Sequence, residues 1–292
     1  MGPTMAAEGG YSNYIPGTYG DFAVALAPET KFTIRNDVYY YQADGGRSVR
    51  AGSVDVEADL EFLMNLTTFL YQPGVELFGA KYAFGALVPI VYVDIEAKAE
   101  VAGVQASVDD DTLGLGDVTL IPWVMFWDWE NVHLSFAEYI VTPTSRYDED
   151  DLANPGLNYW SFDTNIAVTY LNPETGRELS ANIGYIYNTE NPDTDYQTGQ
   201  ELHIDYMFNQ YLSEKFAIGL QGFYLEQVTG DSGDGALLGS FKGEAAGIGP
   251  AVLWNTKIGG SDVSFIAKWL HEYHAERRIE GNHFMLSFAS GF

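Results

Sequence analysis

The feature that most constrains the fold is a regular alternation of apolar and polar residues that recurs along the chain. It is clearest from Val54 to Leu66, where apolar residues occupy every second position and only Leu63 is out of place. A period of two residues is typical of a β-strand whose two faces meet different environments. This run is longer than the ~5–6 residues of an average globular strand. The sequence therefore predicts long strands, each able to cross a membrane.

The same pattern predicts twelve antiparallel strands. Other clear examples are Tyr159–Tyr170, Glu178–Asn188 and Leu202–Asn209. The predicted ranges are 32–42, 54–70, 79–96, 112–127, 131–142, 158–171, 177–190, 200–212, 214–228, 241–255, 261–274 and 281–292. An even number of such strands is typical of a closed, all-β, up-and-down transmembrane barrel of the outer-membrane type.

The lengths of the connections predict an orientation. Most linkers after odd-numbered strands are long and polar or acidic, such as 43–53, 97–111 and 143–157, whereas most linkers after even-numbered strands are short. Outer-membrane barrels have long external loops and short periplasmic turns. We therefore expect an outer-membrane protein of a Gram-negative bacterium with both termini in the periplasm.

Composition excludes several classes of function. The formal net charge is −27, which disfavours any nucleic-acid partner because such binding depends on clustered cations. There is no cysteine, so neither disulfides nor thiolate chemistry need be considered. No apolar run reaches the ~20 residues of a membrane-spanning helix. No cleavable signal peptide is recognised, so we take the chain as a mature form.

The last predicted strand carries a second barrel signal. Phe284, Leu286 and Phe288 alternate toward a terminal Phe292. An aromatic residue that ends an amphipathic strand resembles the signal read by the outer-membrane insertion machinery. We therefore expect that machinery and outer-membrane lipid, including lipopolysaccharide, among the partners.

The polar face of the second strand is the sharpest chemical feature. Asp55, Glu57, Asp59 and Glu61 share one face, which the alternation assigns to the lumen. They would form a cation-favouring pore wall, or alternatively a solvated strand face that continues into the first loop. The full set of residues predicted to line the pore is Arg35, Asp55, Glu57, Asp59, Glu61, Lys81, Asp163, Asn165, Asn182, His203, Asp205, Gln221, Lys268 and His283.

Two prolines lie within predicted neighbouring strands. Pro89 and Pro122 each remove a backbone donor from the ladder. They would weaken one seam and open a lateral gate to the bilayer, or they would be plain bulges that set curvature.

The residues before the first strand form a separate segment. We divide the chain into an N-terminal periplasmic segment, 1–31, and a barrel, 32–292. Glu8–Thr30 contains the apolar run Phe22–Ala27 and is too apolar for a free tail. We expect it to fold into or against the periplasmic mouth as a plug. The alternative is a disordered or capping segment.

No cofactor, metal or catalytic group is predicted. Acidic loops such as Asp148–Asp151 could supply oxygen ligands to Ca²⁺, but their spacing fits no EF-hand and solvated loops are the simpler interpretation. His271 and His274 lack the zinc-binding H-E-x-x-H spacing. No Ser/His/Asp constellation can be assembled from spacing, so we do not expect an enzyme.

Several short motifs together resemble a known family, the outer-membrane channels named for the meta-pathway of phenol degradation (a MetA-type transporter family). The matching residues are Glu8-Gly9-Gly10, Pro16-Gly17, Gly114-Leu115-Gly116-Asp117, Pro143-Thr144, Tyr147, Asn154, Gly156, Asn158, Trp160, Tyr196, Gly199, Gln227, Asp231, Gly233 and Gly247-Ile248-Gly249-Pro250. Ser145 stands where the family pattern usually has Gly. The resemblance implies a monomeric twelve-stranded channel linked to uptake of aromatic or other hydrophobic compounds.

The leading hypothesis is therefore passive uptake of small hydrophobic or aromatic molecules through a lumen partly constricted by loops and the N-terminal segment. A barrel of twelve strands is narrower than the porins of 16–18 strands. Three alternatives stay open: a small cation-preferring porin, a barrel enzyme acting on lipids or peptides, and a structural barrel without conduction.

Overall fold

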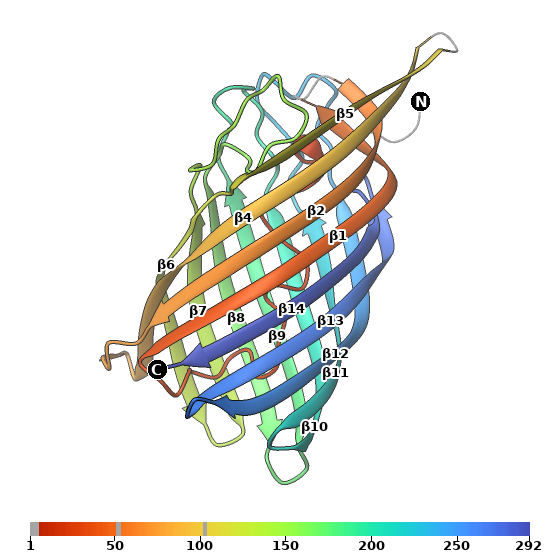
Figure 1. Ribbon diagram of the computed structural model, residues 1–292. Coiled ribbons are helices and arrows are strands. Elements are labelled where there is room, and N and C mark those ends of the chain that lie inside the picture. Colours follow the sequence, from red (N-terminus) through yellow and green to blue (C-terminus); the bar gives the residue numbers. More distant parts are fainter. Residues whose placement is uncertain (1–5, 51–53, 102–103) are drawn as a thin grey trace.

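A computed structural model shows one closed antiparallel barrel whose strands tilt around a central axis (Figure 1). The structure describes residues 6–50, 54–101 and 104–292, and of these the side chains outside 44–58 and 97–106. Its strands are β1 (Phe32–Arg50), β2 (Val54–Tyr71), β3 (Glu76–Leu77), β4 (Ala80–Val101), β5 (Val104–Leu115), β6 (Thr119–Trp129), β7 (Val132–Val141), β8 (Ser161–Asn172), β9 (Arg177–Asn188), β10 (Glu201–Ser213), β11 (Phe216–Gln227), β12 (Glu244–Ile258), β13 (Ser261–Glu276) and β14 (Gly281–Gly291).

The barrel wall has twelve strand positions, which we call staves, as the sequence predicts. Each stave pairs with its sequence neighbour, and β1 pairs with β14 to close the ring. The two-residue strand β3 pairs only with β4, and β5 and β6 are two parts of one stave interrupted at residues 116–118. The predicted fold class is confirmed.

Two predicted loops are wrong. The ranges 43–53 and 97–111 were assigned to long loops, yet β1 and β2 pair as far as Arg50↔Val54, and β4 and β5 pair as far as Val101↔Val104. In the β4–β5 hairpin the backbone pairing runs through the acidic residues Asp109–Asp111, and in the β1–β2 hairpin it continues beyond a bulge between Ala43 and Gly46. Backbone hydrogen bonds form the ladder, so polar side chains do not end it. Figure 1 shows β4 and β5 extending beyond the other strands at one end of the barrel.

The outer surface carries a belt of exposed apolar side chains. Ile166, Leu179, Phe208, Leu220 and Leu286 are each 47–61% exposed and point away from the lumen. Apolar surface of this extent is stable only against lipid or a partner. Among the described residues no helix is long and apolar enough to cross a membrane.

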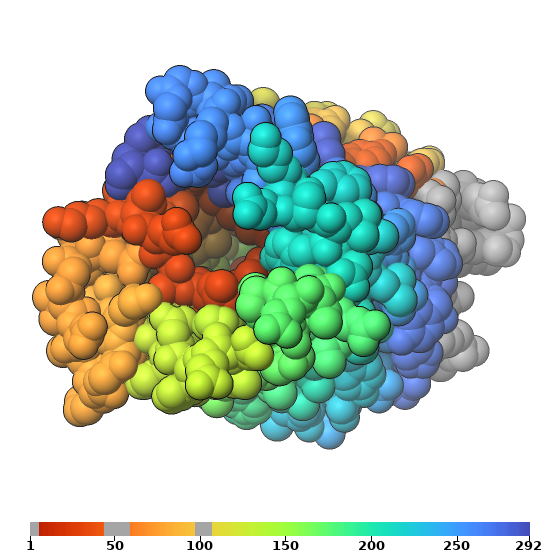
Figure 2. All heavy atoms as spheres, turned by 90° about the horizontal axis from the view of Figure 1, so that it is seen from below, coloured from red at the N-terminus to blue at the C-terminus, as the bar shows by residue number. Residues whose placement is uncertain are grey.

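The N-terminal segment passes through the barrel from end to end. We call residues 6–31 the plug; it contains one short 3-10 helix, η1 (Glu8–Gly10). At the end with the longer loops, Ala6 N donates to Arg277 O at 2.9 Å; at the end with the short turns, Gln72 Nε2 donates to Thr30 O at 3.0 Å. Figure 2, a view from below in the orientation of Figure 1, shows this segment beside a central hollow.

This path corrects the expected placement of the termini. Ala6 lies at the long-loop end, whereas β14 ends at the short-turn end, where Phe292 N donates to Phe32 O at 2.8 Å. The two ends of the described chain therefore lie on opposite sides of the barrel. The prediction that both share one side is wrong for these residues, because polar groups along the whole lumen hold the plug in an extended course.

Candidate functional site

The lumen has two chemically different walls. Six strands, β8–β11, β13 and β14, carry inward polar side chains that are almost completely buried. We call these side chains the polar wall: Asp163, Asn165, Glu178, Asn182, His203, Asp205, Gln221, Lys268 and His283. Inward residues of β2, β4, β6 and β7 are apolar, and we call them the apolar wall: Leu60, Met64, Leu66, Val91, Val93, Ile121, Val124 and Ala137.

The polar wall binds the backbone of the plug. Glu178 Oε1 accepts a hydrogen bond from Ala23 N at 2.9 Å, and Thr169 Oγ1 accepts one from Ala25 N at 3.2 Å. Lys268 Nζ donates to Gly17 O at 2.9 Å and also to the carbonyl of Gly20. These bonds satisfy plug backbone groups that form no ladder of their own.

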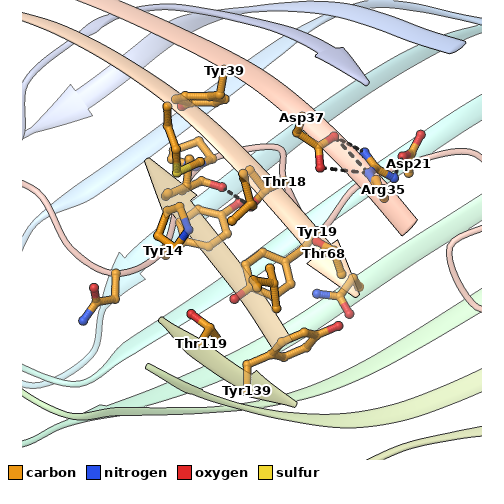
Figure 3. Close-up of a pocket in the computed structure, with 18 of the residues that line it drawn as sticks. Tyr14, Thr18, Tyr19, Asp21, Arg35, Asp37, Tyr39, Thr68, Thr119 and Tyr139 are labelled. Atoms are coloured by element: carbon orange, nitrogen blue, oxygen red, sulfur yellow. Dashed lines mark hydrogen bonds and ion pairs between the residues drawn. The ribbon is translucent and has the colours of Figure 1, made fainter. Parts of the chain in front are cut away.

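An ionic cluster fastens the middle of the plug to β1. The Arg35 guanidinium donates to Asp37 Oδ1 at 2.9 Å, contacts the plug carboxylate Asp21, and donates to Ser287 Oγ at 3.1 Å. Figure 3 shows Asp21, Arg35 and Asp37 together at the side of the cavity. A guanidinium between two carboxylates gives the geometric specificity that a flexible ammonium lacks.

A buried histidine completes the anchoring. His203 is fully buried; its Nε2 lies 3.1 Å from Asp163 Oδ1 and its Nδ1 lies 3.5 Å from Asp205 Oδ2. Its ring stacks on the plug residue Tyr14 with centroids 4.3 Å apart, and the Tyr14 hydroxyl donates to Asp205 Oδ2 at 3.0 Å. One histidine therefore orients two carboxylates and a plug aromatic at once.

Buried carboxylates hold the start of the plug at the long-loop end. Asp231, in the β11–β12 loop, accepts hydrogen bonds from Ala7 N at 3.2 Å and Gly199 N at 3.1 Å. Glu8 accepts one from Asn191 Nδ2 at 3.0 Å. Burial raises the pKa of the Asp231 carboxyl and that of the Glu8 carboxyl.

A cavity of about 650 Å³ remains between the plug and the apolar wall. Met64, Leu66 and Val91 line it from the barrel, and Ile15 and Tyr19 line it from the plug. Figure 3 shows Tyr19 and Tyr139 facing each other there, and their rings meet edge to face with centroids 5.3 Å apart. The volume is in the range of sites that hold a drug-sized ligand.

The structure places most of the predicted pore residues in the interior. Those that face inward are Arg35, Asp163, Asn165, Asn182, His203, Asp205, Gln221, Lys268 and His283. Four of them, Arg35, Asn165, Asn182 and His283, line the cavity. The other five contact the plug or other polar side chains. In β14, Phe284, Leu286 and Phe288 face outward as expected, and Phe292 is 65% exposed.

The inward acidic row is a correction. Glu61 is exposed, while its neighbours Leu60 and Phe62 line the cavity, so Asp59 and Glu61 lie on the outer face. The side chains of Asp55 and Glu57 lie outside the described residues. The sequence interpretation assumed that the apolar face meets lipid, but in β2 the apolar face meets the apolar cavity.

Lys81 is also not at the cavity. Its side chain is 54% exposed and its Nζ lies 2.8 Å from Asp128 Oδ2, near the short turns. Its strand begins at Ala80, so the residue marks the rim of the barrel.

The two prolines do not face each other across a seam. Pro89 is buried beside the cavity, where β4 changes partner: it pairs with β6 up to Leu87↔Thr119 and with β5 from Ile90↔Leu115 onward. Pro122 is exposed and lies in a bulge of β6. The predicted pairing of Pro89 and Pro122 in one seam is therefore wrong, and Pro89 lies instead beside the break between β5 and β6.

A loop fills this break. Asp117, within the break, accepts hydrogen bonds through Oδ1 from Thr144 N at 3.0 Å and Ser145 N at 2.9 Å, and through Oδ2 from Leu157 N at 2.8 Å. A Cβ on Gly156 would lie 2.3 Å from Asp117 Oδ2, so the close approach requires glycine. The 143–157 loop is thereby docked over the only interruption of a stave among the described strands.

Sequence reasoning missed the apolar wall and the anchors Tyr14, Asp21 and Glu178. One signal could have revealed the wall: Leu87–Val93 is apolar at every position, which is typical of a strand with apolar surroundings on both faces. The anchors have no such signal, because they contact a segment with no regular period. Within the described residues, no three His, Asp or Glu side chains are grouped to hold a metal ion.

A family model described as "Putative MetA-pathway of phenol degradation" matches residues 20–288. No curated protein matches. The barrel is similar to the COG4313 outer membrane channel from Pseudomonas putida F1, with a TM-score of 0.67 and 16% identity over 94% of this chain and 100% of that one. It is also similar to the beta domain of the Bordetella autotransporter BrkA, with a TM-score of 0.48 and 9% identity over 90% and 100%. At these identities the structural likeness shows the fold alone.

Proposed function

The chain belongs to the family described as the putative MetA-pathway of phenol degradation, and on this premise we propose that it is an outer-membrane channel for the passive uptake of small hydrophobic or aromatic molecules. The long loops face the cell exterior in this proposal, and the short turns face the periplasm. The plug and the loops constrict the lumen, and the chain acts as a monomer without cofactor or catalysis.

One observation carries the proposal: the free space of the lumen lies mainly against the apolar wall. All eight residues of the apolar wall line it, whereas only three of the nine residues of the polar wall do so, namely Asn165, Asn182 and His283. Leu66, Val91 and Val124 present only hydrocarbon to the 650 Å³ cavity. An apolar solute therefore exchanges water for apolar surface on entry, which is favourable. A hydrated ion meets no compensating polar lining on that side and is disfavoured.

The polar residues predicted to line the pore take a different part in this proposal. Four of them fix the plug in place and do not line the path themselves: Asp163, His203, Asp205 and Lys268. Four of the predicted residues reach the cavity itself and would be polar groups that a passing solute meets: Arg35, Asn165, Asn182 and His283.

We also propose that the break between β5 and β6 is the place for lateral exit into the bilayer, with Pro89 beside it. The inward side of the break opens on the cavity, since Asp117, Pro89 and Gly156 all line it. The 143–157 loop packs on the cavity side of β5, where Leu152 N and Ala153 N donate to Asp110 Oδ2. Among the described strands β5 pairs only with β4, so its other edge carries no partner strand.

The test is uptake into proteoliposomes of an uncharged monoaromatic compound and of a small organic cation, measured in parallel against protein-free liposomes. The expected result is faster uptake of the aromatic compound alone. If the cation enters and the aromatic compound does not, the protein is a cation-preferring porin. If neither solute enters faster and no conductance appears in planar bilayers, the barrel has a structural role and the channel proposal fails.

A further inference from the structure

We infer that the plug stays in place during transport and forms one permanent wall of the solute path, so that plug side chains determine which solutes pass. This inference rests on the proposed uptake function and specifies how it operates. One face of the plug holds it against the barrel, and the opposite face borders the solute path.

The face of the plug toward the polar wall is fastened along its whole length. Hydrogen bonds and ion pairs join the plug to β1, to β8, β9, β10 and β13, and to the loops and turns, at positions from Ala6 to Lys31. Within the described residues, none of these bonds joins the plug to β4, β5, β6 or β7. Moving the plug off this wall would remove one donor each from Glu178 and Asp205. It would leave Lys268, whose hydrogen-bond acceptors are the carbonyls of Gly17 and Gly20, as a buried charge without a partner. Unpaired buried charges of this kind are strongly destabilising.

The opposite face of the plug is apolar and borders the cavity. Ile15 packs on the cluster around Met64 and Val91, and Ala27 packs on the cluster around Val124. Tyr19 meets Tyr139 edge to face at the margin of the cavity, while His203 lies 4.8 Å behind its ring. These contacts are non-directional, and the cavity persists beside them without displacement of the plug.

The two faces therefore have separate roles. Directional bonds fix the plug to one side of the lumen, and the cavity already extends from residues near the long loops, such as Asn154, to residues near the short turns, such as Phe126 of β6. A path that exists with the plug docked needs no opening step. The size and shape of Ile15 and Tyr19 then set the width of that path.

Disulfide staples test the inference directly, because the natural chain has no cysteine. Ala25→Cys with Thr169→Cys joins two residues already linked by a 3.2 Å hydrogen bond. Ala6→Cys with Gly243→Cys joins positions where the two Cβ atoms would lie 3.3 Å apart, close to the ~3.5–4.5 Å of a disulfide. Each double variant is reconstituted once, and aromatic uptake is measured with the staple oxidised and after reduction.

The expected result is uptake that differs by less than twofold between the oxidised and reduced forms of both double variants. Thr68→Trp, which fills the cavity from β2, serves as the blocking control and should lower uptake by tenfold or more in either condition. A loss of more than threefold on oxidation, restored by reduction, overturns the inference while leaving the channel function intact. If wild-type protein shows no uptake above empty liposomes, the proposed function itself has failed.

A second readout addresses specificity. Ile15→Ala should raise the uptake of a bicyclic aromatic compound relative to a monocyclic one by threefold or more, because it widens the path at the plug side. Val24→Ala changes another half-buried plug residue by a similar volume and serves for comparison between plug positions. An unchanged size ratio in Ile15→Ala would show that the plug is away from the path when solutes pass, and would overturn the inference.

Discussion

On the polar wall, buried side chains such as Glu178 and Asp205 accept hydrogen bonds from the plug and leave no space between them. On the apolar wall, Met64 and Val91 offer no polar atom, and the cavity lies beside them. Both walls belong to one continuous sheet and differ only in the residues that point inward. The difference shows how a barrel can hold a segment firmly within its lumen and still keep a path open, since directional bonds act on one side only.

The largest expected effect comes from breaking the ionic attachment of the plug. Arg35→Met leaves Asp21 and Asp37, both nearly fully buried, without their cation. Loss of one partner of a buried pair costs roughly 3–5 kcal/mol. We expect a lower thermal midpoint in detergent micelles and a higher ion conductance in bilayers. Arg35→Lys keeps the charge and should lose less. An unchanged midpoint in Arg35→Met would mean that this cluster does not hold the plug.

Among the described strands the barrel wall is interrupted once, between β5 and β6, and a substitution should release the loop docked there. Asp117→Asn removes the negative charge that accepts hydrogen bonds from Thr144, Ser145 and Leu157. Loss of such charge-assisted bonds costs roughly 1–3 kcal/mol. We expect faster proteolysis within 143–157 in folded protein, with no change in cleavage of the β11–β12 loop. Equal protection of the 143–157 loop in both proteins would contradict the role of Asp117.

The apolar character of the path can be tested by one neutral polar group. Met64→Gln keeps the side-chain length but places an amide against the cavity. Desolvating it costs on the order of 1–2 kcal/mol, so aromatic uptake should fall about tenfold. Met64→Leu is the matched control. The reverse change on the other wall, at a buried position that does not line the cavity, is Gln221→Leu, which should alter uptake by less than about twofold. Equal sensitivity of the two walls would remove the distinction between them.

The plug should be fastened more firmly at mildly acidic pH. Burial raises the pKa of Asp231 and that of Glu8, so the folded state binds their protons more tightly than the unfolded chain. The stability from these groups is fully present below their ordinary pKa values of about 4 and is lost as pH rises through the raised values. Thermal midpoints measured across this window should fall less steeply with pH in Asp231→Asn than in wild type. Parallel curves would show that Asp231 does not contribute.

The sequence predicts the barrel well because alternation and strand pairing are local properties. The β8–β11 strands follow the expected scheme, with Asp163, Asn182 and Asp205 inside and Ile166 and Phe208 outside. In these strands the inner face meets the polar contacts of the plug, so the polar residues point inward as they would toward water.

The assignment fails in β2 because alternation reports that two faces differ, not which face is the lumen. A solvated lumen would have placed Glu61 inside; an apolar lumen places Leu60 and Met64 there instead. The contacts of the plug are equally inaccessible to the sequence, since pairs such as Tyr14 with Asp205 are separated by 191 positions and no periodic pattern connects them.

The smallest expected effect distinguishes a cation at the rim of the barrel from a cation that lines the solute path. Lys81 and Asp128 form an exposed ion pair, with 54% and 35% of their side chains accessible, and such pairs contribute about 0–1 kcal/mol. Lys81→Ala should therefore leave the thermal midpoint and aromatic uptake unchanged, and it should change the cation-to-anion permeability ratio by less than about twofold. Arg35→Met, measured beside it, gives the change expected of a cation that reaches the cavity. A comparable change in Lys81→Ala would place the short-turn rim in the conduction path and extend the polar lining beyond the wall that holds the plug.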